Sequence, residues 1–149
     1  SDDFGSRYLA CFEVGLPEPP VVLVASNYNQ REPAPRIIHE HILLYRRFGV
    51  QVSACTLDPA DHLHHQLAFL LRLDDLLLHD GEDRESVQRA RHDFLGRHLT
   101  HWVGRAAELA AQRQLPAIYQ ALLAVLAAAV EQDDELTSSA VAHLAVEAT

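Results

Sequence analysis

Residues 58–79 read DPADHLHHQLAFLLRLDDLLLH, a stretch that predicts one long amphipathic helix. Asp58 followed by Pro59 is typical of a helix start, because aspartate caps free backbone N–H groups and proline suits the first turn. Leucines then repeat at helical spacing as far as His79, and Gly81 is expected to end the helix. The stretch therefore indicates a helical fold.

Proline and glycine mark further helices on both sides of this stretch. They are expected at residues 7–14, 35–48, 84–111 and 116–131, with a weaker helical tail over 133–149. Asp83 is the expected N-cap of the helix over 84–111. Gly96 and Gly104 weaken the same helix, so a kink is expected near residues 99–102.

The segment over residues 15–35 contains five of the seven prolines and has no helical period. Its apolar run Val21-Val22-Leu23-Val24 offers hydrophobic surface to bury, which favours an ordered loop over disorder. A short strand in the same place is the alternative.

Composition supports one helical domain. Leucine (23) and alanine (21) dominate the 149 residues, and a chain of this length can bury a core without metal or disulfides. We therefore predict an all-α, single-domain helical bundle over residues 1–149. No membrane span is expected, because no uncharged apolar run approaches the required length.

The charged residues exclude several partners and reactions. The net charge is −9, and the 12 basic side chains are all arginine, so the chain repels a phosphate backbone and no nucleic-acid partner is expected. A chain without lysine supports neither a P-loop nor Schiff-base catalysis. No nucleophile motif is present, so no catalytic residues are predicted.

Ten histidines raise the question of a metal site. They gather in His39-Glu40-His41 and in Asp61-His62-Leu63-His64-His65, and the alternative function that they suggest is a helical-bundle metal-binding enzyme. Bundle sites, however, use ligands three or four residues apart on one helical face. Neither Glu-x-x-His nor His-Glu-x-x-His occurs. No metal ligand and no cofactor are therefore predicted.

Residues 61–70, DHLHHQLAFL, resemble the Asp-His-x-x-x-Glu-Leu-x-Phe-Leu signature of the redox-enzyme maturation chaperones, the TorD/DmsD/NarJ class. Other segments follow in the order typical of that family: FEVG (12–15), a stretch around Tyr28, LYRRFGV (44–50) and RARHDFLGRHLTHW (89–102). The resemblance spans residues 8–132. It is strongest to the branch that serves type II dimethyl-sulfoxide-reductase-like molybdoenzymes, such as selenate and chlorate enzymes.

This resemblance implies an all-helical cytoplasmic chaperone without catalytic activity. Members of the family bind the apo catalytic subunit of a molybdoenzyme, often at its N-terminal twin-arginine leader peptide. They hold that subunit until its molybdenum cofactor is inserted, and so delay its export. The partner implied for this chain is therefore a molybdoenzyme catalytic subunit or its leader.

The sequence departs from the family pattern in three places. Ala60 stands where proline normally precedes the Asp-His pair, Gln66 replaces the motif glutamate, and residues 24–26 replace the usual Leu-Tyr-Glu. Family members also begin with helices upstream of Phe12, which this sequence does not show. If those helices are lacking, apolar surface is uncovered, which favours partner binding and a monomer or weak homodimer.

The residues predicted to bind the client peptide are Asp61, His62, Gln66, Tyr28 and Glu40. Carboxylates there would accept charge-assisted hydrogen bonds from leader arginines, and leucine-lined surfaces would take the apolar part of the leader. Two of these residues have alternative roles that remain open. Asp61 is also suited to cap its helix, and His62 to hydrogen-bond the preceding loop.

Overall fold

The computed structural model describes residues 2–15, 17–52, 57–79 and 83–147, and it confirms the all-α expectation over these residues. A 3₁₀ turn and a π-helical segment, η1 and η2, join the α-helices. The elements are α1 (Asp2–Phe12), η1 (Ala25–Tyr28), α2 (Ala34–Arg47), α3 (Leu63–Leu78), α4 (Arg84–Phe94), η2 (Leu95–Leu99), α5 (Thr100–Gln112) and α6 (Ala117–Glu147).

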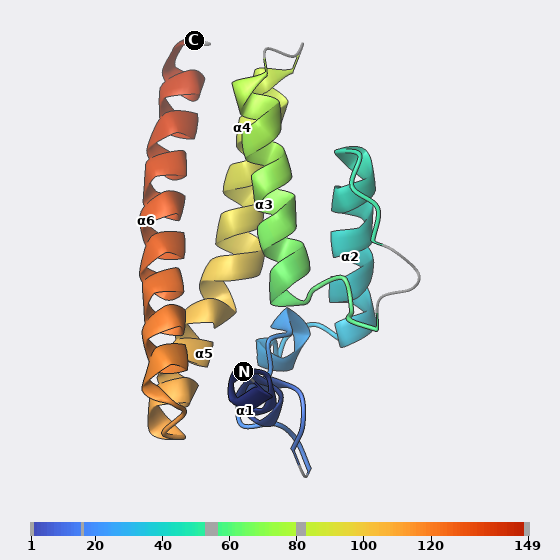
Figure 1. Ribbon diagram of the computed structural model, residues 1–149. Coiled ribbons are helices and arrows are strands. Elements are labelled where there is room, and N and C mark those ends of the chain that lie inside the picture. The colour runs from blue at the N-terminus through green and yellow to red at the C-terminus, as the bar shows by residue number, and fades with distance from the viewer. Residues whose placement is uncertain (1, 16, 53–56, 80–82, 148–149) are drawn as a thin grey trace.

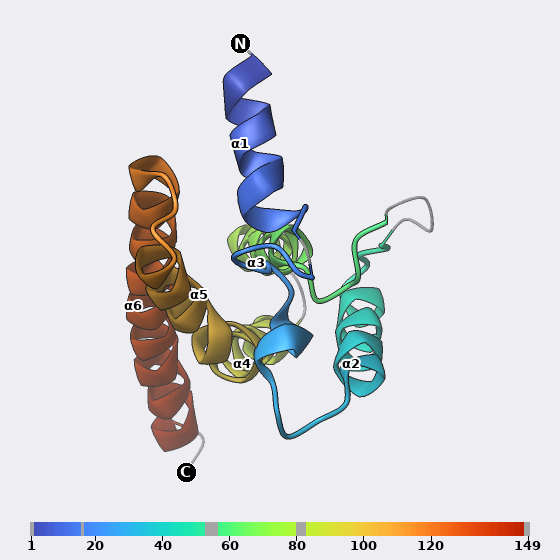
Figure 2. The same ribbon diagram turned by 90° about the horizontal axis from the view of Figure 1, so that it is seen from below.

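The helices form an upright bundle with α1 placed across one end (Figures 1 and 2). Helix α6 lies along α4 and α5 on one side, α3 packs on α4, and α2 stands on the opposite side. Helix α1 is held to the start of α6, because the ring of Phe12 lies 5.2 Å from that of Tyr119 and the Tyr119 hydroxyl donates to the Phe4 carbonyl at 3.1 Å.

Large aromatic side chains from four helices meet in the core. Tyr45 of α2, Phe69 of α3, Phe94 of α4 and Trp102 of α5 are all almost fully buried. The Phe69 ring lies 4.8 Å from Tyr45 and 4.8 Å from Phe94, in tilted and edge-to-face arrangements that aromatic rings prefer. These contacts join α2 to α3 and α4.

The start of α3 differs from the sequence expectation. The helix begins at Leu63, so the expected start at Asp58 and Pro59 is wrong. Residues before the helix pair instead with the proline-rich segment: the Leu63 N–H donates to the Leu23 carbonyl at 2.9 Å, and the Ala25 N–H donates to the Asp61 carbonyl at 3.1 Å. This strand-like pairing requires an extended backbone at His62, which excludes an earlier helix start.

Other expectations have mixed outcomes. Asp83 caps α4 as predicted, by accepting a hydrogen bond from the Ser86 N–H at 3.1 Å. Where a kink was expected near residues 99–102, the structure has the π-helical segment η2 over Leu95–Leu99, which overlaps the expected position only at Leu99. The segment expected over 15–35 is an ordered loop with one 3₁₀ turn over the described residues 15 and 17–33, and its last two predicted residues, 34 and 35, belong to α2. The expected stop at Gly81 lies outside the described residues.

Both terminal helices exceed the predicted bounds. Residues 7–12 are the last turns of α1, which begins at Asp2 and ends at Phe12. The helix expected over 116–131 continues without interruption to Glu147, so the tail is helical as expected over the described residues 133–147 and is joined to α6. None of the described helices combines the length and the hydropathy that crossing a membrane requires.

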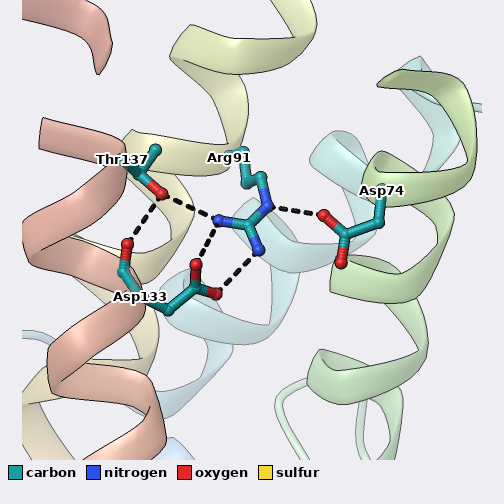
Figure 3. Close-up of polar contacts among 4 residues, drawn as sticks. All are labelled: Asp74, Arg91, Asp133 and Thr137. Carbon is teal, nitrogen blue, oxygen red and sulfur yellow. Dashed lines mark hydrogen bonds and ion pairs between the residues drawn. The ribbon is translucent and has the colours of Figure 1, made fainter. Parts of the chain in front are cut away.

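Figure 3 shows the polar contacts that join α6 to α3 and α4 near Asp133. Arg91 of α4 donates to both carboxylate oxygens of Asp133 at 2.7 and 2.8 Å, to Asp74 of α3 at 2.7 Å and to the Thr137 hydroxyl at 2.8 Å. Burial lowers the pKa of Arg91, but hydrogen bonds to Asp133 and Asp74 outweigh it and raise this pKa. This Arg91 network (Arg91, Asp74, Asp133 and Thr137) ties together α3, α4 and α6.

Candidate functional site

A cleft of about 520 Å³ opens between α2 and the continuous run of α4 and η2. Its apolar lining comes from Leu44, Phe48 and Phe94, and charged side chains surround that lining. The carboxylates are those of Glu40, Asp83, Glu85 and Asp93, and the guanidinium groups are those of Arg47, Arg89 and Arg97. An apolar surface with charged groups around it suits a peptide that has both kinds of side chain.

Most charges around the cleft are already paired within the chain. Arg97 contacts Glu40 at 2.9 Å, Arg89 pairs with Glu85, and Asp83 caps α4. Asp93 is exposed and forms no ion pair or hydrogen bond with the residues that the structure describes. Its carboxylate is therefore available to a ligand in the cleft.

Behind the cleft, the Gln66 side chain is fully buried and links three other residues. Its Nε2 donates to the Nε2 of His41 at 2.9 Å and to the carbonyl of His98 at 3.3 Å, and its Oε1 accepts from the Trp102 Nε1–H at 3.2 Å. Every polar group of the amide thus has a partner. We call these residues (Gln66, His41, His98 and Trp102) the Gln66 network.

The hydrogen bonds of His41 fix its tautomer. Its Nδ1 lies 2.8 Å from the Ile37 carbonyl, which can only accept, so Nδ1 carries the proton. Its Nε2 then accepts from Gln66 and the ring is neutral. Burial lowers the pKa of His41 and favours the same neutral form.

His98 brings this network to the cleft, which it lines together with Phe94. Its ring is nearly buried, lies 4.4 Å from that of His41, and has Nε2 3.7 Å from the Glu40 carboxylate. Burial, followed by the repulsion of His41, lowers the pKa of His98 to about 3. The cleft therefore presents a neutral imidazole despite the nearby carboxylate.

Asp61 is fully buried beside the proline-rich loop. One carboxylate oxygen, Oδ2, accepts from the Ser26 N–H at 2.8 Å, and the other has no partner among the described residues. His62, not Asp61, is the N-cap of α3, because its Nδ1 accepts from the His64 N–H at 3.3 Å. The alternative role of Asp61 as a cap of its own helix is wrong. Asp61 holds the loop to the start of α3.

Tyr28 contacts the Gln66 network at Trp102 and does not line the cleft. Its ring stacks on Trp102 at 5.3 Å, and its hydroxyl donates to the Val22 carbonyl at 2.8 Å. Burial raises the pKa of Tyr28 to about 12. The hydroxyl is therefore a neutral structural donor.

The five predicted site residues do not form one surface. Only Glu40 lines the cleft, while Gln66 and Tyr28 meet through Trp102, and Asp61 with His62 fixes the loop. Sequence reasoning missed Asp93 and His98 as cleft residues. Both lie within the segment 89–102. Helical spacing could have revealed them, because it puts Asp93 on one face with Ala90 and Arg97, and His98 one turn after Phe94.

A family model described as the nitrate reductase delta subunit matches residues 1–108. The matched region includes all the residues of the cleft and of the Gln66 network, which lie within 28–102. The chain belongs to the nitrate reductase delta subunit family. The match contains α1 to the greater part of α5 and stops before α6. No solved structure matches the chain significantly.

Curated relatives of this family member are named as assembly chaperones. The chain is 34% identical over 101 residues to the selenate reductase assembly chaperone protein of Thauera selenatis, which covers 66% of this chain and 52% of that protein. It is 32% identical over 101 residues to the chlorate reductase assembly chaperone protein of Ideonella dechloratans, with the same two coverages. It is 30% identical over 105 residues to the perchlorate reductase assembly chaperone protein of Dechloromonas aromatica, covering 68% and 47%.

These relatives confirm the resemblance to redox-enzyme maturation chaperones. The matched regions span about half the length of each relative. The alternative of a helical-bundle metal-binding enzyme receives no support, because the relatives are named for assembly rather than for a reaction of their own.

Proposed function

We propose that this protein is a cytoplasmic assembly chaperone for a molybdenum-containing reductase and is not itself an enzyme. It would hold the apo catalytic subunit until the cofactor is inserted. The observation that carries the proposal is that the selenate, chlorate and perchlorate relatives are all named as reductase assembly chaperones. The client is therefore expected to be the catalytic subunit of a reductase of the same broad class.

The cleft between α2 and α4 is the proposed client site. Leu44, Phe48 and Phe94 would contact the apolar part of a client segment, and carboxylates around them would accept its arginines. Asp93 is the first candidate, because it has no partner to give up among the residues that the structure describes. Glu40 would have to exchange Arg97 for an arginine of the client. An N-terminal leader in which arginines precede an apolar run has this chemistry.

The remaining predicted residues would act by holding the cleft in shape. Gln66 fixes His98 against α2 through His41, and Tyr28 supports Trp102 from behind. Asp61 and His62 secure the loop that carries Tyr28. Their contribution to client binding would be indirect, since Asp61 and Gln66 have no exposed surface.

Calorimetric titration of three clients tests the proposal: the apo catalytic subunit of the same organism, the same subunit without its leader, and the leader peptide alone. Wild type should bind the full subunit, and Asp93→Asn should weaken binding about tenfold, as loss of one charge-assisted bond implies. The matched control is Glu135→Gln, an exposed carboxylate on α6 outside the cleft. Failure of wild type to bind any of the three would overturn the proposal.

Comparison of the three clients separates two modes of recognition. If removal of the leader from the subunit abolishes binding, the chaperone recognises the leader. If the subunit without its leader binds as tightly as the full subunit, the chaperone recognises the mature part. The weak homodimer stays a separate prediction, which sedimentation over a range of protein concentrations tests.

A further inference from the structure

Asp58, His62 and His64 come together where the chain enters α3. The Nδ1 atoms of His62 and His64 are 2.8 Å apart, and Nδ1 of His64 is 3.7 Å from Oδ2 of Asp58. The nearest ligand atoms of all three residues lie within 4.8 Å of one another. The cluster is separate from the cleft between α2 and α4, to which none of the three contributes.

The helix start explains why two histidines only two residues apart face each other. Inside a helix such residues point in widely different directions. His62, however, is the N-cap of α3 and has extended backbone angles of φ −69° and ψ 144°, so its side chain turns back over the first turn. His64 lies on that turn. Spacing rules for helices therefore predict no metal site here, whereas the capped helix start creates one.

One of the three side chains in the cluster is buried and the other two are partly exposed, so an ion could reach the site from solvent. The His62 residue is 7% exposed and is held by its contacts to the preceding loop, while the side chains of His64 and Asp58 are 49% and 41% exposed. A buried ligand fixes the position of an ion, and the exposed pair leaves a side through which ion and water can enter.

We propose that Asp58, His62 and His64 bind one divalent transition-metal ion, with Zn²⁺ the best match. Two imidazole nitrogens and one carboxylate oxygen are a ligand set that Zn²⁺ takes, with water in the fourth position. The site goes beyond the chaperone function proposed above and does not depend on it.

Binding requires a small rearrangement. Ligand nitrogens at about 2.0–2.1 Å from a tetrahedral Zn²⁺ lie roughly 3.4 Å apart, so the two rings must separate slightly from their present 2.8 Å. The proton on Nδ1 of His64 moves through solvent to Nε2 of the same ring, so that both Nδ1 atoms have a free lone pair for the ion and both imidazoles stay neutral.

An ion at this position would be structural. It would link Asp58, in the segment before the helix, to the first turn of α3. Because His62 also pairs with Val24, the ion would strengthen the attachment of the proline-rich loop as well. A ligand that binds only the folded chain raises its stability.

The test uses the full chain, purified without a histidine tag and stripped with a chelator, with Zn²⁺ or Co²⁺ as the sole added probe. Calorimetry should give one ion per chain, Zn²⁺ should raise the melting temperature, and Co²⁺ should produce the visible absorption of a tetrahedral or five-coordinate complex. His64→Ala and Asp58→Asn should each weaken binding at least about tenfold.

The test changes His64 and Asp58 rather than His62, because His62→Ala would also remove the N-cap of α3 and could destabilise the fold. His39→Ala is the matched control, since His39 is an exposed histidine on α2 outside the cluster. It should bind Zn²⁺ as wild type does. The proposal is overturned if wild type binds no ion, if His64→Ala binds as tightly as wild type, or if His39→Ala loses as much affinity.

Discussion

The Gln66 network is neutral and buried except where His98 reaches the cleft, whereas the Arg91 network is ionic and open to water on one side. Gln66 and His41 have no exposed surface, and every polar group of the Gln66 amide has a protein partner. In the Arg91 network the arginine side chain is 13% exposed, but its partners Asp74 and Asp133 are 43% and 35% exposed.

This difference determines how each network responds to damage. A group orphaned in the Gln66 network has no water to replace the lost partner, so the full desolvation cost appears. A carboxylate orphaned in the Arg91 network can turn to solvent and recover much of its hydration. Residues of similar chemistry should therefore differ in their effect on stability.

The largest effect is expected for Gln66→Leu. Leucine has about the size of glutamine but cannot form hydrogen bonds, so the Trp102 Nε1–H and the His41 Nε2 lose their partners. The free energy of unfolding should fall by about 2–5 kcal/mol. Urea denaturation measures it. Gln112→Leu, at an exposed glutamine of α5, is the control and should change stability little. Equal losses in both variants would contradict the structural role of the network.

Arg91→Ala should have the next largest effect, about 1–3 kcal/mol, because it removes hydrogen bonds to three partners that can become hydrated. Arg91→Lys should recover only part of the loss, since lysine cannot contact both oxygens of Asp133 in the same way. Denaturation curves for the two variants decide this. Recovery of full stability by lysine would mean that the forked geometry is unimportant.

Acid should weaken the Gln66 network through its histidines. The pKa of folded His98, about 3, lies below its ordinary value of 6.5, so the unfolded chain takes up a proton that the folded chain does not. Stability is therefore greatest above pH 6.5 and falls as the pH drops, by about 1.4 kcal/mol between pH 7.5 and 5.5 for His98. His41 adds a contribution of the same sign.

Urea denaturation at several pH values tests this, with His98→Gln compared against His39→Gln at an exposed position of α2. The His98 variant should show a smaller loss of stability on acidification, and the His39 variant should follow wild type. An unchanged pH dependence in His98→Gln would show that folding does not lower the pKa of this histidine.

The smallest effect on stability is expected for Glu40→Gln, outside both networks. The Arg97 side chain is 64% exposed and that of Glu40 31%, so both can be hydrated when the pair is lost, which should cost less than about 1 kcal/mol. Thermal melts measure the loss. The control is Glu32→Gln, which breaks the ion pair between Glu32 and Arg36 at the start of α2. A larger loss for Glu40→Gln would place Glu40 with the structural residues and not with the cleft.

Local sequence rules predicted much of the helical architecture. Gly49, which follows α2, has a positive φ of 76°, a conformation that favours glycine after a helix. Asp83 caps α4, and the helix that contains Gly96 is interrupted by η2. These features depend on a few neighbouring residues, so short patterns are enough to reveal them.

Two helix boundaries that differ from the prediction, the start of α3 and the end of α6, have a different origin. Asp58 and Pro59 satisfy the rules for a helix start, yet pairing with Leu23 and Ala25 holds the following residues extended. Asp133 looks like the beginning of a weak tail, yet Arg91 pairs with it and α6 continues. In both places a contact with a distant segment outweighed the local preference.

Helical periodicity and ordered motifs are local properties, so the amino-acid sequence was enough to predict an all-α chain, the positions of most helices and the chaperone family that it resembles. Only the tertiary structure decided that Asp61 and Gln66 are buried supports, that Glu40 and Asp93 line the cleft, and that His62 and His64 face each other. The physical reason is that burial and hydrogen-bond partners of a polar side chain depend on segments far away in the chain, which no local pattern specifies.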